Sequence, residues 1–591
     1  GKQESLESIL RRTPAAAVQQ IELIRAGAPG IDMQGQTVLA NVVRRHEAQT
    51  RGALEAESAF YERGFHAPRI AAEASRRGGE DLIELSAAAF ETVDDEHGFG
   101  ERPRVAPDGT PLRESIYAPD EGERVREAAA AYERALAGGG LRVSASLQRQ
   151  KFGADIEERI TYPSEDHSTV REFEDEHNSE LGLHFERRLS GSRQIELLAI
   201  HSASSENGGE RGVEADSVTL FRLDSAASES IVRSVLRWQS GLLSLESGLE
   251  ATRNVLDSHN SLEEDGITTP LPNGSVRVEE RRGEVFATAS WSLSAAWRIE
   301  AGSRFEYSRL EQTGDSTLGK SFFFPKPRLL LTWSAAERDR VRVLLEREVG
   351  QLDFEDFVGS ASLSASTVTA GNPDLEPDRT WRLEAAWERR FLDAGMAVLS
   401  VRHERIQDLI DRIPVIAEVP FDAVGNIGDG YRNELEINLT LPLDRFGVRA
   451  GLLKTIALWR HSEATDPTTG ATRPISEDLS REAVIHFSQQ LASARVRWGI
   501  DATLASAARE HYFDEVRTER LGTRIDIFAQ YEPTAAWNFR IFANNLTVRT
   551  AVREREIHDG RRTMAPVSYI ETRTLAIGPY YGISVRRTFG G

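Results

Sequence analysis

The chain has 591 residues, a formal net charge of −21, a mean hydropathy of −0.41 and no cysteine. With no run of about 18 consecutive apolar residues, this composition excludes a bundle of membrane-spanning helices. The missing cysteines exclude disulfide scaffolds, thiol catalysis and Cys-ligated zinc, and the acidic balance argues against binding nucleic acid, which requires a basic face.

Residues 1–49 differ in character from the rest of the chain. Two short segments, Gln20–Ile24 and Thr37–Val43, predict strands, and Ala26–Gly30 between them is turn-forming. A piece of this size is too small to hold a hydrophobic core, so we expect it to pack on something larger. We therefore predict two units, residues 1–49 and residues 50–591.

From about residue 50 onward, segments of roughly 10–20 residues alternate apolar with polar side chains, which is the two-residue period of a strand. In the segment Trp381–Arg390, for example, Leu383 and Trp387 fall on one face and Glu384 and Glu388 on the other. Counting such segments up to Phe589 gives about 22 strands, an even number as single-chain bacterial barrels require.

The connections between these segments separate a barrel from a soluble β-sandwich, which shows the same alternation. Short connections such as Ala137–Gly140 and Leu392–Gly395 alternate with expected long polar loops such as Pro163–Ser168, Asp257–Gly274 and Asp353–Pro377. This rhythm is typical of a barrel with tight periplasmic turns and long outer loops. Charged residues recur on the polar face, where they suit a watery lumen better than a sandwich core. The sequence thus predicts an all-β fold, an antiparallel transmembrane β-barrel of about 22 strands.

The tryptophans recur mainly near the expected strand ends, several of them beside short turns. This placement suits interfacial girdles, where amphipathic rings lie at the level of lipid headgroups. A sandwich core would instead place tryptophans in the middle of strands.

Three ordered segments match the landmarks of a known family. Ile21–Arg45 reads IELIRAGAPGIDMQGQTVLANVVRR, Gly371–Asp378 reads GNPDLEPD, and Asn426–Leu441 reads NIGDGYRNELEINLTL. They resemble, in turn, the second half of the plug, the landmark before a mid-barrel strand, and the G-x-E-x-E strand of TonB-dependent receptors, with Ala26 replacing a usual glycine. The resemblance implies a barrel enclosing a plug domain, of which residues 1–49 are the C-terminal part. We expect the first half of the plug and the TonB-binding box to precede Gly1.

The resemblance also implies a function. Such receptors take up a scarce small ligand, such as a siderophore, vitamin or saccharide, across the bacterial outer membrane into the periplasm. The expected partners are outer-membrane lipid, the TonB protein of the TonB–ExbB–ExbD complex, and an extracellular ligand that the sequence leaves open. The alternatives are a passive porin-like or structural barrel, which differs by its plug, and a soluble all-β binding protein or enzyme, which needs no detergent.

Plug and barrel in this family are held together partly by ion pairs, and the resemblance carries these onto named residues. Arg25 matches the first plug arginine, and Arg44 or Arg45 is a looser match for a second. Glu384 and Glu434 match the barrel glutamates, and alternation independently places both on the polar face. The competing interpretation is that these two glutamates are ordinary solvated lumen charges.

Ligand contacts are expected from the outer loops Asp353–Pro377 and Ala417–Asp429. The first loop contains a mixed aromatic and acidic group that suits stacking on a ligand and, equally, packing within the loop. This group consists of Asp353, Phe354, Asp356 and Phe357.

Other chemical signals are weak. The acidic run Glu172–His177 resembles a solvated strand edge more than a cation site, because it lacks the order of ligands and the glycine of a calcium loop. The chain contains no zinc-protease, phosphate-loop or serine-hydrolase motif. We therefore predict that the protein is not an enzyme and uses no metal or cofactor.

Overall fold

The computed structural model describes residues 18–25, 38–44, 49–93, 97–215, 217–415 and 421–590. These residues form a two-stranded sheet, a closed barrel and a four-stranded sheet. The two-stranded sheet pairs β1 (Val18–Arg25) with β2 (Val38–Arg44), so both strands expected near the start of the chain are confirmed. No helix among the described residues has the length and apolar character needed to cross a bilayer.

The barrel wall has 22 antiparallel strands within the described residues, the number expected from the sequence. The last strand pairs with the first, Phe589 lying opposite Gly52, and this pairing closes the wall. In chain order the strands are β3 (Gln49–Tyr61), β4 (His66–Gly78), β5 (Asp81–Thr92), β8 (Pro111–Leu136), β9 (Gly139–Tyr162), β10 (Asp166–Ser190), β11 (Arg193–Glu214), β12 (Ser217–Ser240), β13 (Leu243–Glu264), β15 (Ser275–Ser292), β16 (Trp297–Gly314), β17 (Leu318–Ala336), β18 (Asp339–Val349), β21 (Arg379–Phe391), β22 (Gly395–Gln407), β25 (Gly430–Pro442), β26 (Gly451–Thr465), β28 (Arg481–Leu491), β29 (Val496–Thr503), β32 (Arg524–Thr534), β33 (Trp537–Asn544) and β36 (Tyr580–Phe589).

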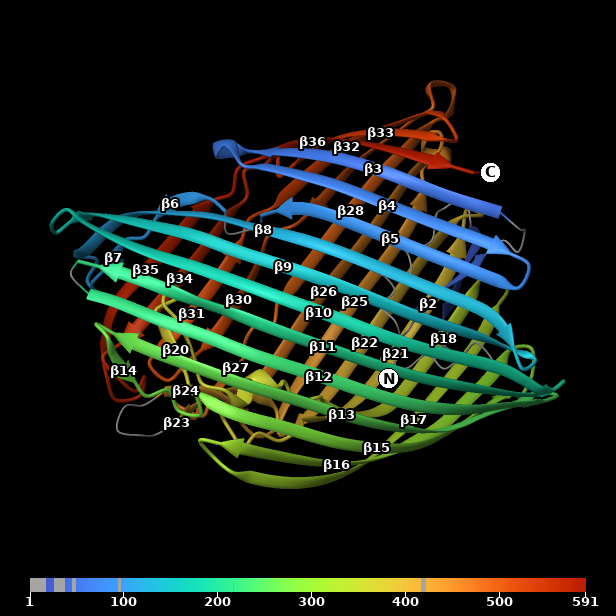
Figure 1. Cartoon of the computed structure of the whole chain (residues 1–591), viewed down its shortest axis with the longest axis horizontal. Coiled ribbons are helices and arrows are strands. Elements are labelled where there is room, and N and C mark those ends of the chain that lie inside the picture. The colour runs from blue at the N-terminus through green and yellow to red at the C-terminus, as the bar shows by residue number, and fades with distance from the viewer. Residues whose placement is uncertain are drawn as a thin grey trace.

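One sector of the wall is much taller than a membrane requires. Strands β8 to β13 have 22 to 26 residues, as the long ribbons in Figure 1 show, whereas about 9–11 residues cross a bilayer. On β9 the outward face is apolar up to Leu147 and then charged from Arg149 through Asp155. The upper halves of these strands therefore stand above the apolar band.

Two expected loops are instead half or more strand. A three-residue turn at positions 163–165 joins β9 to β10, and β13 runs on to Glu264 before the short β14 (Ile267–Thr269). The segments Pro163–Ser168 and Asp257–Gly274 looked like loops because, above the apolar band, both faces of a strand are polar and the alternation disappears.

The shorter strands are topped by smaller elements, which gather at the left end of the barrel in Figure 1. A four-stranded sheet is built from the two loops that precede β21 and β25, and further hairpins extend the wall. These elements are β6 (Phe99–Glu101), β7 (Arg104–Val105), β19 (Ser360–Ser362), β20 (Thr367–Thr369), β23 (Ile410–Val415), β24 (Phe421–Asn426), β27 (Thr472–Arg473), β30 (Ser506–His511), β31 (Glu515–Leu521), β34 (Thr550–His558) and β35 (Val567–Ala576), with the single 3-10 turns η2 (Glu62–Gly64) and η3 (Phe354–Phe357). The 3-10 turns η4 (Asp444–Phe446) and η5 (Ala492–Ala494) lie in tight turns at the opposite end of the barrel.

The two faces of the wall are as the alternation predicted. Leu383 is 49% exposed on the outside, whereas Glu384 and Glu434 are 7% and 6% exposed on the inside. The rings of Trp297 and Trp333 stack at 5.4 Å near the tight-turn end, as expected for a girdle. Apolar side chains thus face outward and charged ones inward, the reverse of a soluble sandwich.

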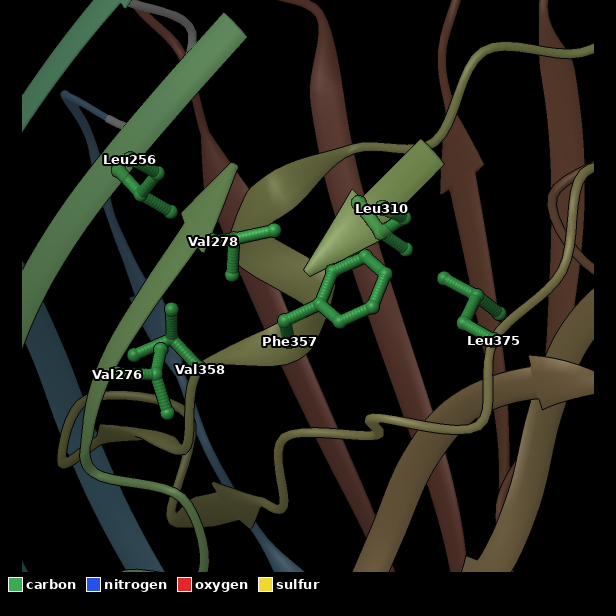
Figure 2. Packing of buried hydrophobic residues seen from close by; sticks show 7 residues of the cluster. All are labelled: Leu256, Val276, Val278, Leu310, Phe357, Val358 and Leu375. Atoms are coloured by element: carbon green, nitrogen blue, oxygen red, sulfur yellow. The ribbon is translucent and has the colours of Figure 1, made fainter. Parts of the chain in front are cut away.

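An apolar cluster anchors the loop of residues 350–378, named here the roof loop, to the inner wall. Phe357, which is fully buried, projects from the loop toward Leu310 and Val278 (Figure 2). The cluster comprises Phe357, Val358 and Leu375 of the roof loop and Leu256, Val276, Val278 and Leu310 of β13, β15 and β16. The roof loop therefore folds inward against the barrel wall.

Candidate functional site

A row of alternating charges crosses the inner wall from β17 to β25. Glu346 lies opposite Arg382 in the strand register, Arg382 opposite Glu404, and Glu404 opposite Arg432. The guanidinium of Arg382 contacts Glu346 at 3.2 Å and Glu404 at 2.8 Å, while Arg328 contacts Glu346 at 3.2 Å. We call these five residues the ion-pair belt. Each buried carboxylate in it has guanidinium partners on both neighbouring strands, which compensates its desolvation.

The two glutamates predicted to meet the plug lie in a second such row. Glu384 of β21 and Glu434 of β25 share Arg402 of β22, whose Nε donates to Glu384 at 3.1 Å and whose Nη1 donates to Glu434 at 2.5 Å. Arg460 of β26 donates to the other oxygen of Glu434 at 3.0 Å.

The proposed plug partners of these glutamates are only partly described. Arg25 ends β1 and Arg44 ends β2, but the side chains of both arginines, and all of Arg45, lie outside the described residues. The plug–barrel ion pairs therefore stay a prediction.

A different row of side chains lines the inside of the tall sector. Glu127 lies opposite Gln148, and Gln148 opposite Asn178. One step along, Glu180 lies opposite Ser202, and Ser202 opposite Glu229. We call these inward residues, with Ser204 and Asn254, the acidic wall. Glu180 and Glu229 have amides and hydroxyls as cross-strand neighbours, and Glu127 has Gln148 and Ala88, whereas the carboxylates of the ion-pair belt have arginines.

Hydrogen bonds hold the roof loop over the acidic wall. Asp353 caps η3 by accepting a hydrogen bond from the backbone N–H of Glu355 at 3.0 Å. The carboxylate of Glu210 on β11 accepts from the backbone N–H groups of Leu363 and Ser364 at 2.7 and 3.0 Å. The loop is therefore tied directly to the tall sector, because its own backbone donors bond to a wall side chain.

A cavity of about 610 Å³ lies between the roof loop and the acidic wall. Asp353, Phe354 and Glu355 line it from the loop, and Glu127, Glu180 and Glu229 line it from the wall. None of the described lining residues is a lysine or an arginine. A cavity of this size falls within the range that encloses a small-molecule ligand.

The structure divides the aromatic and acidic group predicted from the sequence. Asp353 and Phe354 line the cavity, whereas Phe357 is buried in the apolar cluster and meets Phe354 edge-on at 6.2 Å. Asp356 lies between them, where its backbone carbonyl accepts from the N–H of Asn372 at 2.9 Å. One half of the group thus faces the cavity and the other half fixes the loop.

The loop carboxyls have raised pKa values. Burial, followed by the negative charge of Asp353, raises the pKa of Asp356 to about 6. Burial, followed by repulsion from Asp353 and Glu176, also raises the pKa of Glu355. A concentration of negative charge therefore surrounds this side of the roof loop, and Glu176 of the acidic run noted in the sequence contributes to it.

A buried charge network joins three further loops. Arg473 contacts Asp411 at 2.8 Å and Asp466 at 3.2 Å, and Arg562 contacts Asp466 at 2.7 Å. Three loops that are distant in sequence are thereby locked to one another at the open end of the barrel.

A smaller cavity of about 460 Å³ lies near the seam between β3 and β36. Tyr61 and Tyr580 stack there at 4.3 Å, and Glu62, Arg524 and Arg549 are charged residues of its lining. Among the described residues, no group of three or more His, Asp or Glu side chains is arranged to hold a metal ion.

The wall residues of the main cavity carry no motif that distinguishes them in the sequence. Glu127, Glu180 and Glu229 are ordinary inward positions by alternation. The sequence feature that could have pointed to them is the run of inward serines, asparagines and glutamines around them on β9 to β13. The ion-pair belt has arginines beside its glutamates instead. Only the strand register shows which of these side chains are neighbours.

The chain resembles solved receptor structures over nearly its whole length. The siderophore receptor PiuA from Acinetobacter baumannii has 13% identity and a TM-score of 0.66, with 97% of this chain and 86% of that chain covered. The ferric yersiniabactin uptake receptor FyuA from Yersinia pestis has 12% identity and a TM-score of 0.62, with 97% and 85% covered. The copper transporter OprC has 10% identity and a TM-score of 0.62, with 97% and 86% covered. At these identities the likeness shows the fold.

Two further comparisons concern the sequence itself. No curated protein matches the chain. Residues 135–546 match the family described as TonB dependent receptor-like, beta-barrel, and this span covers most of the wall, the roof loop and both charged rows. The chain therefore belongs to the TonB-dependent receptor family.

Proposed function

We propose that the protein is an outer-membrane receptor that actively takes up a scarce small ligand into the periplasm. The observation that carries this proposal is the cavity that Asp353 and Phe354 share with the acidic wall, inside a barrel of this family. The open end with its loops would face the exterior, and the tight turns the periplasm. Energy would come from the TonB–ExbB–ExbD complex, which the family implies as partner.

We further propose that residues 1–49 are the C-terminal part of the plug and residues 50–591 the barrel. In this proposal Arg25 and Arg44 pair with Glu384 and Glu434. The known contacts of Glu384 support it, because Arg402 takes Oε2 and no ion pair to a described residue takes Oε1. A plug guanidinium at that oxygen would complete a bridge between two arginines.

Uptake is tested with the full-length receptor in a strain that lacks it. Cells are supplied with ferric chelates, copper, cobalamin or saccharides as the sole source of the nutrient. We expect receptor-dependent growth on one class, which is lost when TonB is deleted or a protonophore is added. Growth that is independent of TonB, or steady conductance of the purified receptor in planar bilayers, would instead indicate a passive pore.

The cavity is tested in the same cells with Asp353→Asn combined with Phe354→Ala. We expect the uptake rate at low ligand concentration to fall by about tenfold or more, because hot-spot contacts are lost. Asp374→Asn is the matched control, since this roof-loop carboxylate is 82% exposed and does not line the cavity. Unchanged amounts of heat-modifiable receptor show that the double variant still folds.

The plug–barrel pairs are tested by exchanging charges. Arg25→Glu and Glu384→Arg are each expected to loosen the plug and admit a large antibiotic that the wild-type receptor excludes. The double exchange is expected to restore exclusion, because the pair is rebuilt with reversed polarity. Additive leakage in the double variant would contradict the pairing without affecting the uptake proposal.

A further inference from the structure

The outer face of the tall sector carries a groove of its own, at the height where the apolar band of the wall ends. The groove has a volume of about 500 Å³ and crosses β8, β9, β10 and β11. On β9 it lies between Leu147, which is 64% exposed, and Arg149, the first charged residue above it on the outward face. With the open end of the barrel facing the exterior, this is the height at which lipid headgroups of the outer leaflet meet water.

The lower edge of the groove is a row of mostly small outward residues. In the strand register Ala128 lies opposite Leu147, Leu147 opposite Ser179, and Ser179 opposite Ala203. Three of these four side chains extend little beyond Cβ, so the row forms a shallow floor from which Leu147 projects. Such a floor can receive the upper part of an acyl chain, because it continues into the apolar band below.

The upper edge of the groove is a row of basic residues. Arg126 of β8 lies opposite Arg149 of β9, and Arg149 lies opposite His177 of β10. All three residues line the groove. Like charges that face each other on neighbouring strands destabilise a sheet, so an anionic group bound between the two arginines would stabilise this part of the wall.

The acidic side chain in this row balances only part of its positive charge. Asp175 accepts hydrogen bonds from Arg149 at 2.9 and 2.7 Å, and it lies 2.8 Å from Nζ of Lys151 and 3.4 Å from Nε2 of His177. One carboxylate is thus shared by an arginine, a lysine and a histidine. Arg126 forms no ion pair with any residue that the structure describes. The groove therefore presents guanidinium groups to an outside anion.

A second basic row on the outer face is neutralised more fully by its own strands. Arg253 of β13, Arg281 of β15 and Arg309 of β16 follow one another in register. Glu279 contacts Arg253 at 3.0 Å and Arg281 at 2.8 Å, and Glu311 contacts Arg309 at 2.5 Å. None of these arginines lines the groove. The exposed large apolar residues nearest to this row on the same strands are Leu249, Val285 and Tyr307.

We propose that the groove binds the phosphate-bearing headgroup of an outer-leaflet lipid, with Arg126 and Arg149 holding the phosphate. A guanidinium presents a fork of N–H donors that matches phosphate oxygens, and a phosphate monoester carries a charge of about −1.5 to −2 at neutral pH. The acyl chains continue past Ala128 and Leu147 along the apolar band. This site concerns how the receptor is seated in its membrane, and it is independent of the ligand that the receptor takes up.

The test compares two lipids that have the same acyl chains. Purified full-length receptor in a neutral detergent is titrated with dilauroyl phosphatidic acid or with dilauroyl phosphatidylcholine, and native mass spectrometry measures the fraction of receptor that carries lipid. We expect phosphatidic acid to bind about tenfold more tightly, because each basic side chain adds to the attraction for an anionic headgroup. The preference should shrink as the concentration of ammonium acetate rises.

Two double variants locate the site. Arg126→Gln with Arg149→Gln is expected to reduce the preference to about twofold, because both guanidinium groups leave the groove. Arg281→Gln with Arg309→Gln is the matched control, which removes two arginines from the second basic row and is expected to leave the preference unchanged. All four side chains are exposed, so both variants should fold, and heat-modifiable migration checks this.

Three results would overturn the proposal. Equal affinity for the two lipids would show that the groove does not recognise phosphate. Equal losses in the two double variants would show that any basic residue at this height suffices. Displacement of phosphatidic acid by an equal concentration of inorganic phosphate would show a site for soluble anions. Because the assay contains neither a transported ligand nor TonB, its failure leaves the uptake proposal standing, and a failure of uptake leaves the lipid site standing.

Discussion

The inner wall of this barrel is built in two different ways. Between β17 and β25, glutamates and arginines alternate across neighbouring strands, as at Glu346, Arg382 and Glu404. Between β8 and β13, glutamates such as Glu180 and Glu229 alternate with serines and amides. Both sectors place charge in the lumen, but the cross-strand neighbours of Glu404 are arginines, whereas those of Glu229 are a serine and an asparagine.

The difference teaches which strands of the wall are held to one another by side-chain ion pairs and which present neutral polar groups beside their glutamates. A compensated row of ion pairs fixes the positions of its strands, because each side chain is held from two sides. Where serines and amides stand across from a glutamate, the strands are joined by their backbone ladder and the side chains present hydrogen-bonding groups to the lumen. The predictions below test this contrast from the largest expected effect to the smallest.

The roof loop is the element that turns the acidic wall into a cavity, and Phe357 is its anchor. Phe357→Ala is expected to weaken docking of the loop by about 3–5 kcal/mol, because a fully buried ring is removed and leaves a void. Hydrogen exchange of residues 350–378 measures this loss as reduced protection. Phe446→Ala is the control, since Phe446 is 65% exposed in a turn at the opposite end of the barrel. If protection is unchanged, the apolar cluster does not hold the loop.

The ion-pair belt should be costly to break. Arg382→Met is expected to lower the free energy of unfolding by about 2–3 kcal/mol, because Glu346 and Glu404 each lose a guanidinium partner in a buried site. Urea unfolding in lipid vesicles measures the change. Arg171→Met is the matched control, because its pair with Asp155 is exposed on the outer face and should contribute about 0–1 kcal/mol. Equal losses in the two variants would show that the belt has no special role.

Local alternation was sufficient to predict the faces of the wall, because it depends on adjacent residues alone. Leu383 and Glu384 were placed correctly on that basis, and the strand number followed from repeating the same pattern. The alternation of apolar and polar residues ended where the outer face of a strand also became polar. Strands β10 and β13 therefore extend into segments that looked like loops.

The cavity was harder to predict because its parts meet only through long-range contacts. Asp353 and Phe354 were noticed for their side chains, but their role depends on Phe357 finding Val276 and Val278 on a distant strand. The neighbours of Glu229 are fixed by register between strands, which no local pattern reveals. The plug contacts of Arg25 and Arg44 stay a prediction.

The loops at the open end should respond to pH through Asp422. Its carboxylate accepts a hydrogen bond from the backbone N–H of Phe513 at 2.7 Å, and burial, reinforced by Asp514, raises its pKa from 3.8 to about 7. A raised pKa favours the protonated, docked state, so this contribution is complete below pH 3.8 and is lost as pH rises through about 7. We expect docking to weaken by on the order of 2 kcal/mol across that window.

Hydrogen exchange of β24 at several pH values checks this behaviour. Asp422→Asn should remove the pH dependence of loop docking that Asp422 contributes, while keeping an acceptor for the backbone N–H of Phe513. Asp429→Asn should preserve the pH dependence of loop docking, because this neighbouring carboxylate is exposed and paired with Arg405. Docking that strengthens with rising pH in the wild-type receptor would contradict the assignment.

The smallest expected effect is a gain in stability of the roof loop, where the other variants lose stability. Glu355→Gln is expected to stabilise the roof loop by about 0.2–0.5 kcal/mol, because it removes repulsion from Asp353 and Glu176 in a partly solvated site. Hydrogen exchange at neutral pH and low salt measures the gain, and added salt should erase it. Glu376→Gln is the control, since Glu376 lies 3.6 Å from Lys320 and should lose a little stability when neutralised. If Glu355→Gln destabilised the loop, a favourable contact of the Glu355 carboxylate would outweigh its repulsion from Asp353 and Glu176.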